Sequence, residues 1–140
     1  MEKLLCGKYE RNVDFKGRVI IPKKLIEPDT EILYLKDTEY NFKIFELEQY
    51  KLIIEKYKEI YINTYDNQKK KSIDITLFDL LDQVIVPGSI DSLSRALLSM
   101  EIRKKYEIDK KTLLIGFYDH IKVFPNIENY KKYEEKIKTM

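Results

Sequence analysis

The sequence predicts an α+β fold in which two similar halves share one small core, and three observations lead to this prediction. A charged turn followed by a short apolar run occurs twice, starting at Asp14 and again 77 residues later at Asp91. After each copy, two runs of β-branched and aromatic residues flank a polar turn, which is typical of a β-hairpin. An apolar stripe at helical spacing follows each hairpin. An internal duplication explains this order better than chance does.

The first motif, residues 14–25, combines a tight turn, a short strand and a helix start. Asp14 favours opening a turn, and Gly17 supplies the positive φ that other residues avoid. The strand ends at Pro22, which cannot donate to a β-ladder but fits the first helical position. Four basic side chains accompany the single acid: Lys16, Arg18, Lys23 and Lys24. Cations held on a rigid strand end suit recognition of phosphates and base edges, although the pattern also fits an ordinary hairpin with solvated lysines.

The second motif, residues 91–102, keeps the turn-opening Asp91 and an arginine, Arg95, but departs from the first copy elsewhere. Ser94 replaces the turn glycine, and Ser99 stands where the first copy has proline. We expect a strained or reshaped turn, because a serine in the left-handed conformation costs on the order of 1 kcal/mol. Ser99 is suited to capping the short helix that proline would otherwise begin. The two lysines that follow the first strand are also replaced, by Met100 and Glu101.

The remaining elements of the first half follow from periodicity and turn chemistry. Residues 5–13 predict a strand, and a short helix after Pro22 should end near residue 27, before Pro28. Residues 32–35 and 42–45 predict the two strands of a hairpin, joined by a polar turn over residues 36–41. A helix follows, because apolar residues recur at helical spacing: Tyr50, Ile53, Ile54, Tyr57 and Ile60.

The second half begins with a polar stretch, residues 63–71, that we interpret as a linker. Asp74 is suited to capping a helix with an apolar face formed by Leu77, Leu80, Leu81 and Val84. Residues 86–90 predict an interrupted strand, and residues 101–106 a short helix. Residues 112–116 and 121–124 predict the second hairpin, and the final helix starts at residues 125–126.

A D-x-x-G-R turn followed by an apolar strand and proline, duplicated in a chain of this length, resembles the MraZ family of bacterial transcription regulators. That family belongs to the wider group of AbrB-like swapped-hairpin proteins. The resemblance covers residues 5–133 and is weaker in the second motif. It implies two repeats, residues 1–66 and residues 67–140, which interleave their hairpins about a pseudo-twofold axis. Together they would form one small β-barrel with flanking helices.

The resemblance also implies partners and a site. It implies a ring-like homo-oligomer that binds short repeats in double-stranded DNA near the promoter of a cell-division and cell-wall gene cluster. By its position, Arg18 is the main base-reading residue, because arginine can contact guanine through two hydrogen bonds. Lys16, Lys23 and Lys24 would hold phosphates, with Arg95 as a weaker pseudo-symmetric partner.

Two other functions stay open. One is an antitoxin-like module of the AbrB fold whose main partner is a protein; a disordered toxin-binding tail would indicate it, and the sequence shows none. The other is an assembly module whose ring is retained while DNA binding has weakened, as the degenerate second motif suggests. A salt-dependent gel shift with the DNA upstream of the chain's own coding sequence would separate these functions.

Composition and residue types restrict the function further. The net charge is +2, so nucleic-acid binding must rest on local clusters. The single cysteine, Cys6, rules out an internal disulfide, and with one histidine, His120, the chain lacks the residues of a typical zinc site. We interpret His120 as a hairpin-tip or packed residue. An acid–base pair with Asp119 is the alternative, but no nucleophile is matched to it by spacing, so we expect no enzyme, no cofactor and no small-molecule substrate. No apolar run approaches a membrane span, which predicts a cytoplasmic, nucleoid-associated protein.

Overall fold

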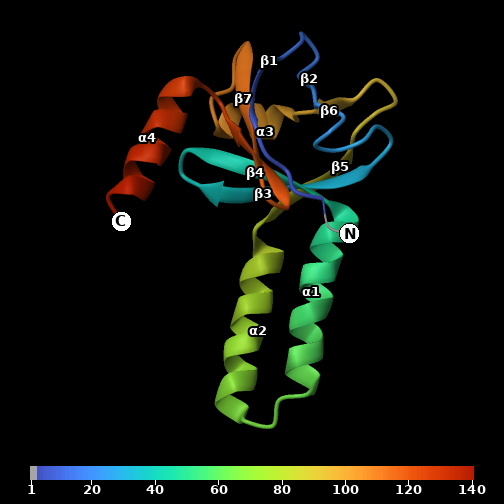
Figure 1. Ribbon diagram of the computed structural model, residues 1–140, viewed down its shortest axis with the longest axis vertical. Helices are drawn as coiled ribbons and strands as arrows, with labels where there is room; N and C mark the ends of the chain where they lie inside the picture. Colours follow the sequence, from blue (N-terminus) through green and yellow to red (C-terminus); the bar gives the residue numbers. More distant parts are fainter. Residues whose placement is uncertain (1–2) are drawn as a thin grey trace.

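Six strands form the main antiparallel sheet of the computed structural model, which describes residues 3–140 (Figure 1). The strand order is β1-β7-β8-β4-β3-β5, and β2 pairs with β6 in a separate two-stranded sheet. In chain order the elements are β1 (Lys8–Asn12), β2 (Arg18–Ile20), β3 (Glu31–Thr38), β4 (Asn41–Glu46), α1 (Leu47–Ile62), α2 (Asn67–Asp82), β5 (Val84–Ser89), β6 (Arg95–Leu97), α3 (Met100–Lys105), β7 (Lys111–Phe117), β8 (His120–Phe124) and α4 (Ile127–Lys138). The predicted α+β class and both predicted hairpins are confirmed.

The strand pairings interleave the two halves of the chain. β1 pairs with β7, and in the same manner β5 pairs with β3. The remaining two contacts join corresponding strands, β4 with β8 and β2 with β6. Each hairpin therefore completes its sheet with a strand from the other half of the chain. Neither half could keep this sheet on its own, because every interior strand would lose a ladder of backbone hydrogen bonds.

The predicted closed β-barrel is wrong. The main sheet ends at β1 on one side and at β5 on the other. Both edges meet the two-stranded sheet through isolated bridges, Val13 with Val19 and Ile90 with Ala96. The physical reason is length: β2 and β6 have three residues each, and each leaves its sheet directly after pairing with the other. Three residues cannot make a full ladder with a strand on both sides along their whole length.

The main core lies between the two sheets. Val19 and Ala96 point into it from the short sheet, and Phe42 and Ile44 from the central strand β4. A second, smaller cluster lies on the other face of the main sheet, at the base of α1; its buried members are Leu33, Leu35, Phe45 and Tyr50. On that same face, α4 packs its Tyr130 and Tyr133 rings against Phe124. Tertiary packing thus covers both faces of the sheet.

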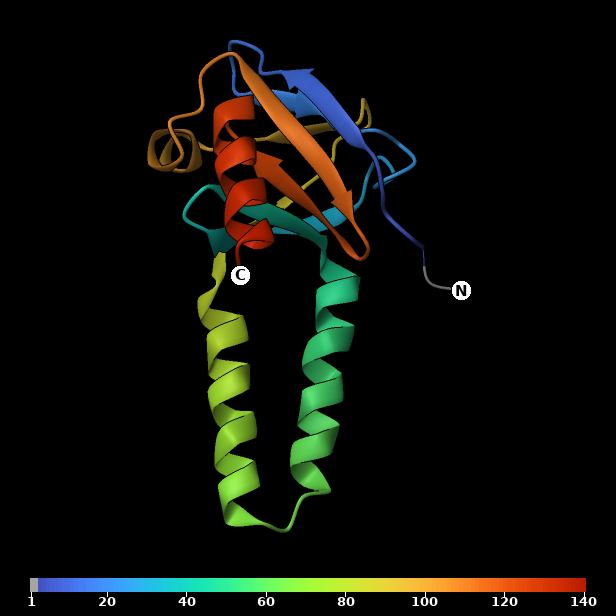
Figure 2. The same cartoon turned by 60° about the vertical axis from the view of Figure 1, so that its left-hand side comes forward.

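Helices α1 and α2 form an antiparallel hairpin that projects away from the sheets (Figures 1 and 2). This arrangement corrects the interpretation of residues 63–71 as a linker, because α2 begins at Asn67. The side chain of Asp66, rather than Asp74, caps α2 by accepting hydrogen bonds from the backbone amides of Gln68 and Lys69. The lysines that suggested a solvated loop therefore lie in the first turns of a helix. Within residues 3–140, no helix has the length and apolar character needed to cross a membrane.

The segments after the two short strands differ. The first copy makes one helical turn, in which the amides of Leu25 and Ile26 donate to the carbonyl of Pro22, and not the predicted short helix. In the second copy α3 forms, and Ser99 caps it by accepting a hydrogen bond from the amide of Ile102 at 3.2 Å. The predicted capping role of Ser99 is confirmed. A serine cap satisfies a free helical amide, which proline cannot do.

Candidate nucleic-acid interface

The two D-x-x-x-R turns have nearly the same geometry. Oδ1 of Asp14 accepts hydrogen bonds from the backbone amides of Lys16 and Arg18, both at 2.9 Å, and Oδ2 accepts one from Arg18 Nε at 2.7 Å. In the second turn, Oδ1 of Asp91 accepts from the amide two residues on at 2.9 Å and from that of Arg95 at 2.8 Å. Its Oδ2 accepts from Arg95 Nε at 2.7 Å. Each aspartate therefore shapes its turn and orients its arginine at once.

The fourth residue of each turn has a positive φ. Gly17 has φ 87° and Ser94 has φ 64°, which confirms that Ser94 takes the left-handed conformation of the glycine it replaces. The amides of both residues close their turns by donating to the carbonyls of Asp14 and Asp91, at 2.9 and 3.0 Å. The Ser94 Oγ is buried and has no hydrogen-bond partner within residues 3–140. The second turn is thus strained rather than reshaped.

Across the short sheet, each turn accepts a backbone hydrogen bond from the residue that follows the strand of the other motif. The carbonyl of Gly17 accepts from the amide of Leu98 at 2.8 Å, and the carbonyl of Ser94 accepts from the amide of Ile21 at 2.7 Å. Contact is close at Gly17, because a Cβ there would lie 2.8 Å from the Leu98 carbonyl oxygen and 2.7 Å from Arg103 Nε. The backbone thereby holds the two turns at a fixed separation.

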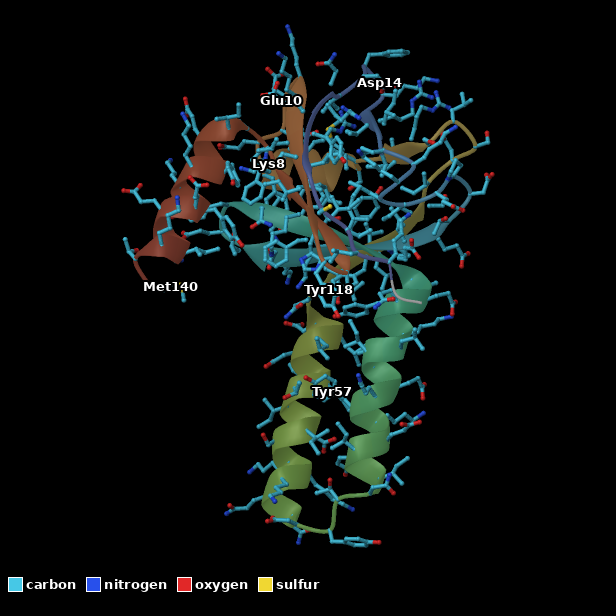
Figure 3. The ribbon with its side chains drawn as sticks, viewed as in Figure 1. Lys8, Glu10, Asp14, Tyr57, Tyr118 and Met140 are labelled. Carbon is cyan, nitrogen blue, oxygen red and sulfur yellow. The ribbon has the colours of Figure 1, made fainter. Side chains whose placement is uncertain are left out.

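This register brings the two arginines onto one surface. In the β2–β6 pair, Arg18 lies opposite Leu97, and Arg95 lies opposite Ile20. Since side chains alternate along a strand, these four residues share the outer face, while the two central residues point into the core. Figure 3 places Asp14 at one end of the molecule, and Tyr57 lies on the helical hairpin at the opposite end. We call this surface, with the two turns, the turn face.

Electrostatics keep the turn face charged. Hydrogen bonding, first from the backbone amide of Arg18 and then from its side chain, holds the pKa of Asp14 below its usual range. The amide of Arg95 has the same effect on the pKa of Asp91. The Arg18 side chain is 25% exposed, and within residues 3–140 its two terminal nitrogens have no hydrogen-bond partner. Arg18 is therefore held through Nε with its terminal donors available, as bidentate recognition requires.

The charge around the two arginines is unequal. Lys16 and Lys23 are exposed on the first turn and its flank. Lys24 is also exposed, but its ammonium lies 5.1 Å from the centre of the Tyr9 ring, and hydrogen bonding to Tyr9 raises the pKa of Lys24. In the second half, the residues at the positions of Lys16 and Lys23 are exposed apolar side chains, Leu93 and Met100. Within the turns themselves, the first carries Lys16 and the second Leu93. The strand pairing crosses the segments that follow, so the segment with Lys23 leaves β2 beside Ser94 of the second turn, and the one with Met100 leaves β6 beside Gly17 of the first.

Phe15 was not identified from the sequence as a residue that could contact a partner. Its ring lies in the first turn, is 88% exposed, and has the Lys16 ammonium 5.7 Å from its centre. An aromatic residue inside a D-x-x-G turn, where it cannot reach a core, is the sequence signal that could have identified it. It adds an apolar surface beside the cations.

The Asp119–His120 pair does form, with Nδ1 of His120 2.7 Å from the Asp119 carboxylate. The ring stacks on Phe45 at 4.8 Å between centroids, and burial lowers the pKa of His120. This environment is that of a packed residue. In the part of the chain that the structure describes, no three histidine, cysteine or acidic side chains gather in a way that could hold a metal ion.

No protein-family model matches the chain, but curated proteins do. The chain is 31% identical over 122 residues to the transcriptional regulator MraZ of Thermoanaerobacter sp. (strain X514), a match that covers 86% of this chain and 80% of that protein. The chain belongs to the MraZ family. The MraZ proteins of Caldanaerobacter subterraneus subsp. tengcongensis and Clostridium tetani are 30% and 26% identical to it, over 86% and 94% of this chain and 80% and 88% of the respective relatives. Membership in the MraZ family supports a role as a transcription regulator, and these relatives are named as regulators rather than as enzymes.

Proposed function

We propose that this MraZ-family protein binds double-stranded DNA through its turn face, with Arg18 as the base-reading residue. The observation that carries this proposal is the arginine held through Nε by Asp14, with its terminal donors unpartnered within residues 3–140. An arginine fixed in this way loses little side-chain freedom on binding and presents a fork that matches guanine. Arg95 has the same local geometry and contributes less, because its turn lacks lysines.

Phosphate contacts are assigned to three basic residues of the first motif: Lys16, Lys23 and Lys24. All three are exposed: Lys16 lies in the first turn, and the other two lie in the segment after β2, which leaves the short sheet beside Ser94 of the second turn. Contacts of this kind position a protein on DNA without reading its sequence. Lys24 is the most restrained of them, because it also contacts Tyr9.

The proposal includes an assembly and a target. Residues 1–66 and 67–140 are two repeats of one interleaved unit, and several such chains form a ring that presents its turn faces together. The ring engages short promoter-proximal repeats of a cell-division and cell-wall gene cluster, in the cytoplasm at the nucleoid. Linked turn faces raise the effective concentration of each contact, so modest single-site affinity suffices.

Fluorescence anisotropy on a fragment containing the repeats, with a scrambled fragment and a salt series, tests the proposal. Arg18→Ala should cost about 1–3 kcal/mol in binding and relax specificity at one position, and it should cost more than Arg95→Ala. Lys23→Ala should weaken all sequences alike and lower the salt slope by about one, whereas Lys132→Ala on α4 is the charge-matched control without effect. Equal losses for the two arginines would show that both turns read DNA.

An assembly module with weakened DNA binding is the second candidate. The exposed apolar residues of the second motif, Leu93 in its turn and Met100 at the start of α3, favour it, because such side chains suit protein contacts better than phosphate contacts. If neither arginine variant alters DNA binding while light scattering shows an intact ring, the assembly function is the correct one.

A further inference from the structure

We propose that two copies of the chain associate through α2, packed antiparallel about a twofold axis. The contact is the α2 stripe, defined as Ile75, Phe78 and Leu81. This inference goes beyond the ring proposed above, and it does not depend on DNA binding. A ring can be built from head-to-tail contacts, whereas the α2 contact uses the same surface of both chains.

Helix α2 leaves one apolar side exposed to solvent in the single chain. None of its sixteen residues, all described by the structure, is buried. Its half-buried apolar residues lie at helical spacing on one side, with Leu80 packed against the cluster at the base of α1. The α2 stripe lies on a different side and is exposed: Ile75 by 54%, Phe78 by 67% and Leu81 by 59%. Figure 2 shows the hairpin standing clear of both sheets, and the exposed fractions show that the stripe is left largely uncovered by the rest of residues 3–140.

The apolar surface continues from the stripe toward the sheet. Leu81 also lines a groove of about 510 Å³ between the base of the hairpin and β3. Most of the lining is apolar, with Leu33, Leu47, Tyr50, Ile54 and Val84 among the contributing residues. A row of large apolar side chains that ends in an apolar groove is typical of a protein-contact surface rather than of a solvated helix.

The charge order along α2 indicates the partner. Three lysines lie near its N-terminus, Lys69, Lys70 and Lys71, and three aspartates lie further along, Asp74, Asp79 and Asp82. The first turn has no acidic residue and the last turn has no basic residue. The cap Asp66 already places a carboxylate at the N-terminus, but the three aspartates lie toward the C-terminal end, where the helix dipole favours cations. An antiparallel copy of α2 places its lysines beside these aspartates and its aspartates beside these lysines.

One register satisfies the apolar and the charged residues together. If Ile75 lies opposite Phe78 of the second copy, then Lys71 lies opposite Asp82, and the twofold axis repeats both contacts. On a helix, Lys71, Ile75, Phe78 and Asp82 follow one another at spacings of three and four residues, so they share a face. The second copy therefore meets the stripe with complementary charge at both of its ends.

Sedimentation velocity on the full-length chain tests the contact with a matched pair of variants. Ile75→Ser removes part of the stripe, and Ile60→Ser removes an isoleucine of similar exposure, 49%, from α1. We expect Ile75→Ser to weaken dimerisation by about tenfold or more, because the axis deletes two apolar side chains per contact. Ile60→Ser should leave the mass distribution unchanged. Identical distributions for the two variants, both folded by circular dichroism, would overturn the proposal.

A charge swap tests the register. Lys71→Glu should weaken association because it places two carboxylates together, and the double variant Lys71→Glu/Asp82→Lys should restore it. A double variant no better than Lys71→Glu would refute the antiparallel pairing. Reduced DNA affinity of Lys71→Glu with unchanged association would assign the lysines to DNA and overturn the proposal. If Ile75→Ser halves the mass of the assembly but leaves a smaller ring, then the α2 contact exists and is separate from the contacts that form the ring.

Discussion

Lys43 of β4 lies directly opposite Lys122 of β8 in the antiparallel register, and one carboxylate serves both lysines. Asp37 Oδ2 is 2.5 Å from the Lys122 ammonium, and its Oδ1 is 3.9 Å from that of Lys43. Lys122 is buried, with its ammonium 4.6 Å from the centre of the Phe117 ring. Hydrogen bonds from Lys122 and Asn41 hold the pKa of Asp37 below its usual range, although burial alone would raise that pKa.

Asp37→Asn should destabilise the protein by about 3–5 kcal/mol, because it leaves two facing cations without a counter-charge in a largely buried site. Urea unfolding measures this loss. Lys122→Met in the Asp37→Asn background is the control, and it should recover a large part of the stability by removing the buried cation. Additive effects of the two substitutions would show that the ion pair does not couple β3 to β8.

His120 should make stability depend on pH near neutrality. Burial against Phe45 and Phe117 lowers the pKa of His120, and nearby Lys43 and Lys122 act in the same direction, while Asp119 opposes them. A lowered pKa in the folded state means that the unfolded chain binds the proton more readily. The stabilising contribution is therefore full above the unfolded pKa of about 6.5, and it is lost as pH falls toward the folded value.

The measurement is the urea midpoint of the wild type and of His120→Phe between about pH 7 and pH 5. The wild type should lose stability as the pH falls through this window, and the variant should show a flatter profile. Parallel profiles would mean that His120 has the same pKa in the folded and unfolded chains.

Ser94→Gly should leave stability equal or raise it by up to about 1 kcal/mol, because it removes left-handed strain and a buried hydroxyl without a partner. The extra freedom of glycine in the unfolded chain offsets part of this gain. Gly17→Ser is the reverse change at the corresponding position. It should destabilise clearly, since its Cβ would meet the Leu98 carbonyl and Arg103. Denaturant midpoints compare the two; a loss of stability in Ser94→Gly would contradict the strain argument.

Asp14→Ala should lower DNA affinity and relax specificity, although Asp14 itself carries a negative charge. On charge alone, removing a carboxylate strengthens DNA binding, so the sign of the effect separates orientation from electrostatics. We expect orientation to dominate, because Arg18 loses the bond that holds its Nε. Anisotropy titrations compare Asp14→Ala with Glu10→Ala, an acid of β1 outside the turn. Tighter binding by Asp14→Ala would show that the carboxylate does not position Arg18.

The sequence by itself determined the local elements and the duplicated turn. Asp14 and Asp91 bond to amides two and four residues away, and such short-range turn chemistry is readable from spacing. The hairpins, α1 and α4 followed from periodicity for the same reason. The start of α2 was missed because the lysines around residue 70 resemble a solvated loop, while the cap at Asp66 that overrides them is a single side chain.

Tertiary structure decided which residues meet. Arg18 and Arg95 share one face because β2 and β6 pair in a particular register, and Lys43 faces Lys122 through the pairing of β4 with β8. The open sheet, in place of a closed barrel, also depends on how far two three-residue strands can extend their ladders. Register is set by side chains packing from segments far apart in the chain, and a shift of one residue would invert every face, so no local pattern could predict it.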